Sequence, residues 1–232
     1  MKKLFVLAAV ICFAHLATAQ DAADNTPKFH FGVKVGAGTT WLRSEKNSAD
    51  NTPESDGSLL RASYGFIGDI RFSKNYYFST GVDVSYGGGK LKKSVGDTIT
   101  WEETLRLSYV EFPLTLRLQT NPIGYLKYYF QAGISPGINL KSQYDLKGSA
   151  TPGPNPAEQE AVDASDDING INLSMIIGGG ITYNLTGTTD MIVGLTFRNG
   201  LLDISDKNST NPVLSNSKLI ANMLNLNVGI LF

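Results

Sequence analysis

The sequence is poor in the residue types that most often build disulfides, metal sites and catalytic centres. Among 232 residues there is one cysteine, Cys12, and there are two histidines, His15 and His30. Cys12 and His15 both fall in an N-terminal segment that we expect to be removed. The mature chain therefore has no disulfide and no cysteine-based metal site, and no cofactor is predicted.

Long apolar runs are also scarce. The run Leu4–Ala14 follows Lys2 and Lys3, and Ala17-Thr18-Ala19 comes shortly after it. A basic start, a short apolar run and an A-x-A site are typical of a secretory signal peptide, and the run is too short for a membrane-spanning helix. We expect cleavage after Ala19, so that the mature chain begins at Gln20.

An excess of positive charge is missing as well. The chain has 20 Lys and Arg against 21 Asp and Glu, and loss of the two signal lysines leaves a net charge near −3. Nucleic-acid binding domains usually carry a basic patch or stripe. Nucleic acid is therefore not expected as a partner.

What fills the remaining chain is alternation of apolar and polar residues with a period of two, which indicates β-strands. The opposite face of these runs is polar or glycine. Eight runs show the pattern: 29–41, 59–72, 76–86, 105–118, 128–140, 171–185, 191–200 and 224–232.

The fourth run changes phase along its length. Leu105, Leu107 and Tyr109 share one parity, whereas Leu114 and Leu116 share the other. A β-bulge near residues 111–113 would restore a single apolar face, and proline is tolerated at bulges. We therefore predict a bulge at this point.

The connections between the runs alternate in length. Short links follow the second, fourth and sixth runs, whereas long polar links follow the others, at about 42–58, 87–104, 141–169 and 203–217. This alternation is typical of an outer-membrane barrel with tight periplasmic turns and large external loops.

Aromatic residues gather at both predicted ends of the strands, as expected at the two membrane–water interfaces. Trp101 is also expected near the external end. The predicted interface aromatics are Phe31, Phe72, Tyr76, Tyr128, Tyr183 and Phe232 at the periplasmic end, with Trp41 and Tyr86 at the external end.

The last run, 224–232, ends the chain on an apolar strand. Within hydrocarbon every backbone group must be paired, so this strand must close a ring with the first one. The predicted fold is all-β, an eight-stranded antiparallel up-and-down transmembrane β-barrel in the cell outer membrane. Its predicted divisions are a signal peptide at 1–19, a periplasmic segment at 20–28 and the barrel domain at 29–232.

The polar face of the runs predicts the content of the barrel interior. An eight-stranded barrel is just wide enough for side chains to fill it, and sheltered charges are expected to pair. A rigid, ion-paired interior is the favoured interpretation, and a narrow, slightly cationic pore for small anions is the alternative. The predicted lumen charges are Lys34, Arg61, Asp69, Arg71, Asp83, Glu111, Arg117 and Arg198.

Other motifs do not predict chemistry. His30 has no second histidine in the mature chain, so it is interpreted as a polar residue at the periplasmic mouth, and the protein is predicted not to be an enzyme. The stretch 86–90, YGGGK, lacks the following Ser or Thr and the helix of a phosphate-binding loop. The acidic stretch 151–170 fails the EF-hand pattern and is predicted to be a mobile external loop. Loose divalent-cation binding and contact with a basic patch of a partner stay open for it.

Several motifs occur together in a characteristic order: YVEFPLTLRL, YYFQAGISPGINL, MIIGGGITYNL, VGLTFRNGLLDIS and LNLNVGILF. In this order the chain resembles the PorT-like small outer-membrane β-barrel family along its whole mature length. The resemblance implies an outer-membrane location and, for some members, a part in secretion or gliding machinery. For most members no activity is known, so the resemblance implies a location and a fold rather than a role.

The sequence thus favours a structural or adaptor role, in which external loops face a partner or the cell surface. A narrow pore and an accessory subunit of a secretion complex are the alternatives. Expected contacts are outer-membrane lipid, lipopolysaccharide and the barrel-assembly machinery, the last through the C-terminal strand ending at Phe232.

Overall fold

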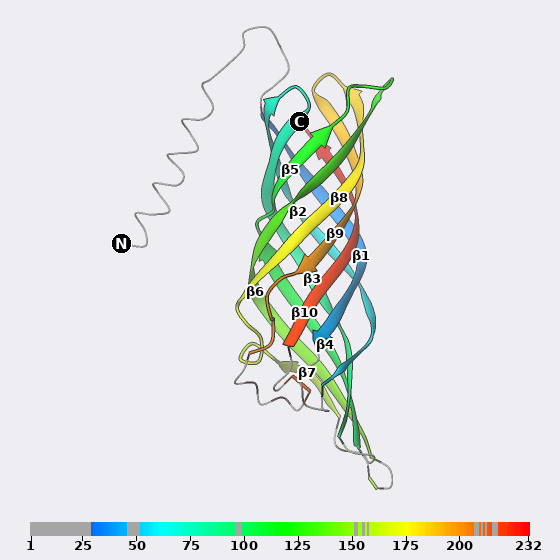
Figure 1. Cartoon of the computed structure of the whole chain (residues 1–232). Helices are drawn as coiled ribbons and strands as arrows, with labels where there is room; N and C mark the ends of the chain where they lie inside the picture. The colour runs from blue at the N-terminus through cyan, green and yellow to red at the C-terminus, as the bar shows by residue number, and fades with distance from the viewer. Residues whose placement is uncertain are drawn as a thin grey trace, which may run out of the picture.

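A closed barrel of long, tilted antiparallel strands makes up the protein (Figure 1). The structure, a computed structural model, describes residues 29–45, 52–95, 99–150, 153–154, 156, 158–206, 209, 211, 213–214 and 218–232. The predicted signal peptide 1–19 and periplasmic segment 20–28 lie outside the described residues. Within the described ranges there is no helix long and apolar enough to cross a membrane.

Each barrel strand pairs antiparallel with its neighbours, and the ring of eight strands confirms the predicted fold class. Strands β4 and β5 are the two halves of one barrel strand, because β4 and β5 both pair with β3 and with β6. The short β7 pairs with the external part of β6 and stands outside the ring. The strands are β1 (Phe29–Glu45), β2 (Glu54–Ser73), β3 (Tyr76–Val95), β4 (Ile99–Glu111), β5 (Leu114–Gln119), β6 (Leu126–Ala150), β7 (Gln159–Asp163), β8 (Ile171–Thr186), β9 (Thr189–Gly200) and β10 (Lys218–Leu231).

Closure of the ring explains why the chain ends on an apolar strand. β10 pairs with β1 from Lys218 opposite Glu45 to Leu231 opposite Gly32. The terminal Phe232 N–H donates to the Phe31 carbonyl oxygen at 2.7 Å, and the two rings lie 5.7 Å apart. The last residues thus complete the wall, as predicted, and no strand edge is left open there.

The outward face gives the height of the apolar band. On β3 it runs from Tyr76 to Tyr86, ten residues later. At about 3.3 Å per residue and a tilt of roughly 40°, this span is about 25 Å high, which is the height of the apolar band of outer-membrane barrels.

Of the predicted interface aromatics, Trp41 is half-buried and stacks on Phe197. The others are exposed: Phe31, Phe72, Tyr76, Tyr86, Tyr128, Tyr183 and Phe232.

Two of the predicted external loops are mostly strand. β3 continues to Val95 and β4 begins at Ile99, where the sequence indicated a loop over 87–104. β6 continues to Ala150, and the predicted mobile acidic loop contains β7, which pairs Val162 with Tyr144. Figure 1 shows β3, β4 and β6 reaching well beyond the other strands at the end away from the C-terminus.

The predicted bulge at residues 111–113 is wrong. Leu105, Leu107, Glu111 and Arg117 are all buried, so the odd-numbered residues face inward along β4 and β5 without a change of phase. What changes along the strand is its surroundings. Within the membrane the apolar side chains face outward to lipid. On the external side of the membrane the apolar side chains face inward, and charged side chains such as Arg106 face water. The register shift in this part of the wall lies between β4 and β6, at Ser108/Tyr109 of β4.

Candidate functional site

The barrel interior holds the first of two buried ion-pair clusters at mid-height. Asp83 of β3 is 1% exposed and accepts from Lys34 Nζ at 2.8 Å and from Arg198 Nη2 at 2.7 Å. Arg198 of β9 also contacts the Glu111 carboxylate of β4 at 3.0 Å. Two cations and two carboxylates from four different strands therefore bridge the interior, which satisfies charges that would be costly alone.

The second cluster lies closer to the periplasmic end. Arg117 of β5 pairs with the Asp69 carboxylate of β2. Arg117 Nη2 donates to Ser79 Oγ at 3.3 Å and to Gln131 Oε1 at 3.4 Å. The guanidinium also lies 4.9 Å from the centre of the Tyr129 ring, at cation–π distance.

Two of the predicted lumen charges stand apart from these clusters. Arg71 lies near the periplasmic end of β2, opposite Tyr77 of β3. Arg61 lies towards the external end, opposite Gly38 of β1. The structure thus joins six of the predicted lumen charges in the two clusters, whereas Arg61 and Arg71 do not belong to either cluster. The six are Lys34, Asp69, Asp83, Glu111, Arg117 and Arg198.

Little free volume accompanies these charges. A cavity of about 40 Å³ lies between the two clusters, lined by Lys34, Arg117 and Arg198. A second cavity, of about 30 Å³, lies on the external side, beside Glu111 and Arg198. Since one water molecule needs roughly 10–15 Å³, each of these spaces has room for only a few waters.

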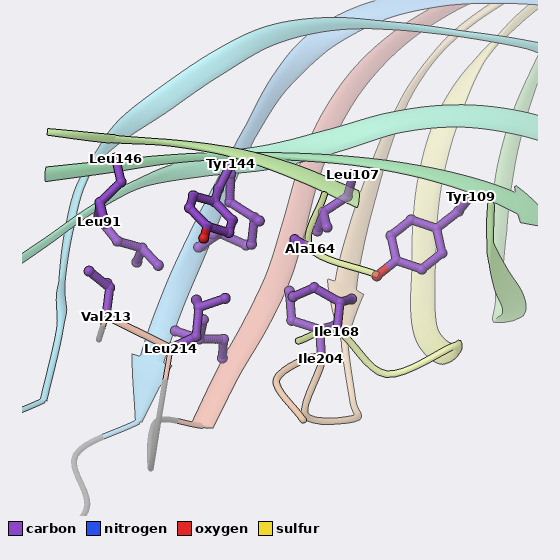
Figure 2. Packing of buried hydrophobic residues seen from close by; sticks show 13 residues of the cluster. Leu91, Leu107, Tyr109, Tyr144, Leu146, Ala164, Ile168, Ile204, Val213 and Leu214 are labelled. Carbon is purple, nitrogen blue, oxygen red and sulfur yellow. The ribbon is translucent and has the colours of Figure 1, made fainter. Parts of the chain in front are cut away.

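Apolar side chains fill the external mouth of the barrel (Figure 2). Inward residues of the extended strands meet side chains from two external segments, and we call this assembly the plug. Sequence reasoning missed it, although the apolar pair Val213–Leu214 in a polar stretch was an available signal. The strand residues are Leu42, Leu91, Leu105, Leu107, Tyr109, Tyr144, Leu146 and Leu219, and the segment residues are Ala164, Ile168, Ile204, Val213 and Leu214; Trp101, expected at the interface, packs against them.

Asparagine and aspartate side chains hold the plug segments in place. Asn169 Nδ2 donates to the backbone carbonyls of Asp203 at 3.0 Å and Ser205 at 2.9 Å. Asp203 Oδ1 accepts from the Leu219 N–H at 2.9 Å, which ties the segment to β10. Asn211 Oδ1 accepts from the Val213 N–H at 2.8 Å. These local bonds satisfy the backbone of a segment without regular secondary structure.

One carboxyl group is enclosed by the plug. Glu103 of β4 is 1% exposed, and both of its carboxylate oxygens are buried within the plug. Burial raises its pKa to about 8, and the negative charge of Asp167 adds to this, whereas Asn211 and Lys93 act in the opposite direction. The group is therefore held mainly in its neutral form at pH 7.

His30 lies at the periplasmic mouth, where the sequence placed it. Its ring is 6.3 Å from the ring of Tyr77, and in the β1–β2 register it stands opposite Asp69, which is engaged by Arg117. Within the described part of the chain, no three His, Cys, Asp or Glu side chains gather as metal ligands would.

Several solved structures are similar to this chain. Among solved structures, Neisserial surface protein A is 13% identical with a TM-score of 0.43, over 89% of this chain and 98% of that one. Ail of Yersinia pestis is 11% identical with a TM-score of 0.36, over 89% and 100%. OprG from Pseudomonas aeruginosa is 8% identical with a TM-score of 0.38, over 88% and 95%. A search of curated proteins finds no match.

The family comparison covers most of the chain. The family described as outer membrane protein beta-barrel domain matches residues 18–206. The match includes the barrel wall from β1 to β9 and both ion-pair clusters. The chain therefore belongs to the outer membrane protein beta-barrel domain family, and its location is the outer membrane.

Proposed function

We propose that this protein is a non-enzymatic, closed barrel with a structural or adaptor role at the cell surface. The observation that carries the proposal is the filled interior, in which two ion-pair clusters and the plug follow one another along the axis. In the part of the chain that the structure describes, the interior is filled at several levels, so we assign the role of the protein to the surface that it presents outward.

The external extension is the part that we assign to partner binding. It consists of the ends of β3, β4 and β6 together with β7, all of which lie beyond the apolar band. Charged side chains cover its outside, among them Lys92 paired with Glu102 and Lys147 paired with Glu158. A rigid, charged, sheet-like surface suits reversible contact with another protein, because it costs little ordering on binding.

The same proposal includes a more specific adaptor role, a route of delivery to the membrane and contacts with lipid. The resemblance to PorT-like barrels supports an accessory place in a secretion or gliding complex as the main alternative adaptor role. Delivery is proposed to use a signal peptide cleaved after Ala19, followed by recognition of the strand ending at Phe232 by the barrel-assembly machinery. The outward apolar face and the external rim would then contact lipid and lipopolysaccharide.

The adaptor role is tested by cross-linking in detergent-solubilised outer membrane followed by affinity purification. Wild type is compared with the double variant Glu102→Lys/Glu158→Lys, which alters the charge of the external extension. The matched control is Lys74→Glu in the periplasmic turn between β2 and β3. We expect a defined partner that is retained by the control and lost from the double variant. Recovery of the barrel alone, or equal recovery of a partner by both variants, would contradict the proposal.

A further inference from the structure

The cavity between the two ion-pair clusters is lined by cations but not by carboxylates. Its volume is about 40 Å³, and Lys34, Arg117 and Arg198 form part of its wall. Among the described residues that line it, none is acidic. The carboxylates that pair with the three cations therefore stand behind them, away from the cavity.

Each of the two arginines keeps one donor without an acceptor. The terminal nitrogens of Arg198 contact Asp83 at 2.7 Å and Glu111 at 3.0 Å. Those of Arg117 contact Asp69 and two side-chain oxygens of neighbouring strands. In both arginines Nε is buried and has no hydrogen-bond partner among the described residues. The residues are only 4% and 6% exposed, and a buried donor without an acceptor is costly.

Other side chains on the cavity wall add further donors. Thr196 Oγ1 accepts from Asn227 Nδ2 at 3.0 Å, so its own hydroxyl hydrogen can donate to a different acceptor. Gln131 Oε1 accepts from Arg117 at 3.4 Å, which keeps its NH₂ group as a donor. All of these residues line the cavity. A wall rich in donors suits a ligand that only accepts hydrogen bonds.

The barrel interior also has more positive than negative charge. The two clusters are balanced, because they contain three cations and three carboxylates. Lys127 and Asp190 at the periplasmic mouth add one charge of each sign. Arg61 and Arg71 share the inward-facing parity of Asp69 on β2, and they add two positive charges. A bound anion would offset part of this excess.

The size of the cavity limits the anion to a small one. Since one water needs roughly 10–15 Å³, the cavity has room for a halide ion, which is slightly larger than water, and little else. Towards the periplasmic end its wall is apolar, where Ile67, Tyr129 and Ile192 form a buried cluster with Leu231. This layer shields an ion from bulk water on that side, so the attraction of the nearby cations is screened less.

We propose that this cavity binds one small inorganic anion, chloride, with Lys34, Arg117 and Arg198 as its cationic neighbours and Thr196 as a hydroxyl donor. The anion links the two ion-pair clusters and stabilises the folded barrel. The inference goes beyond the adaptor role, because it concerns the interior and makes no use of the external extension.

The first test is urea unfolding of the full barrel in lipid vesicles, with potassium chloride replacing potassium gluconate at constant ionic strength. Gluconate is too large for the cavity, so chloride is the only candidate ligand that varies. A ligand that binds only the folded state at one site raises the folding equilibrium constant about tenfold for each tenfold increase in concentration above its Kd. We expect this dependence in the wild type.

The double variant Asp69→Asn/Arg117→Gln removes one cation from the cavity wall together with its carboxylate partner, so no buried charge is left unpaired. We expect its chloride dependence to move to at least tenfold higher concentration. The matched control is Arg106→Gln/Asp145→Asn, which removes an ion pair of the same residue types that does not line the cavity. It should keep the wild-type dependence, and the heat-dependent shift on gels establishes that each variant is folded.

The second test locates the ion in the wild type and needs no variant. Crystals of the barrel grown with bromide are expected to show an anomalous peak inside the cavity. Bromide found only on the outer surface would show that the cavity holds water and would overturn the proposal. Wild-type stability that does not change with chloride, or that changes equally in Asp69→Asn/Arg117→Gln, would overturn it as well.

Discussion

Glu103 has the strongest expected pH dependence of any single side chain in the plug. Its pKa is about 8 in the closed structure and about 4.5 when the group is exposed to water. Between these values an opened plug releases a proton that the closed plug retains, so rising pH favours opening. Plug stability should fall by about 1.4 kcal/mol per pH unit in this window and stay constant below and above it.

Hydrogen exchange of the Val213 amide, whose N–H donates to Asn211 Oδ1, reports this opening. The neutral variant Glu103→Gln serves as the reference at each pH, because comparison with it cancels the intrinsic pH dependence of exchange. We expect the ratio of wild-type to variant exchange to rise about tenfold per unit between pH 5 and 8. A constant ratio would show that Glu103 stays charged in the closed plug.

Asp83 is the residue on which the mid-height cluster depends, since it accepts from both Lys34 and Arg198. Asp83→Ala leaves two cations with Glu111 as their remaining carboxylate. Breaking a buried pair costs about 3–5 kcal/mol, and the partial exposure of Lys34 places the expected loss at the lower end. Urea unfolding of the barrel in lipid vesicles measures it.

Lys92→Ala is the control for that experiment, because Lys92 is exposed and its contact with Glu102 is 3.6 Å long. Its expected effect is within about 0.5 kcal/mol. If Asp83→Ala unfolded at the same urea concentration as this control, the cluster would contribute nothing to stability.

At the scale of single elements, β10 seals the barrel and exposes Leu226 and Val228. In the double variant Leu226→Arg/Val228→Arg, each charge on the lipid face should cost roughly 2–4 kcal/mol near the midplane. We expect assembly to fail, as judged by loss of the heat-modifiable band and of outer-membrane protein. The control is Ser94→Arg/Glu102→Arg on the exposed part of β3 and β4. Normal assembly of the β10 variant would show that this face does not contact lipid.

The elements also show where an alternating pattern misleads. Leu105 and Arg117 share one parity on β4 and β5, and both point inward, although one is apolar and the other is charged. A rule that equates apolar with outward holds within the membrane and reverses beyond it. The sequence shows the alternation but not the height at which the membrane ends. The apolar residues change parity at that height, and this looked like the change of phase that a bulge causes.

For the whole molecule, the two ion-pair clusters and the plug together predict that the barrel shows no steady ion conductance in planar bilayers. The Arg198 cluster should keep the barrel closed even when Val213→Asp/Leu214→Asp disrupts the plug, because the adjoining cavities hold only a few waters. The measurement is single-channel recording at both polarities. Reproducible anion-preferring current in wild type, lost in Arg198→Ala, would instead favour the pore.

The sequence by itself determined that eight alternating runs must close into an outer-membrane barrel. Period-two patterning, short and long links, and an apolar last strand depend on local order along the chain, and hydrocarbon tolerates no unpaired edge. It also placed Asp83, Arg117 and Arg198 on the inner face, because parity is a property of the strand.

Only the tertiary structure decided which of these charges meet. Arg198 and Asp83 are 115 positions apart, and their contact depends on the stagger of the whole ring rather than on any local pattern. The same holds for the plug, where Val213 and Leu214 are buried against Leu91 and Leu105. Such long-range packing follows from closure of the barrel in space, which parity and composition do not encode.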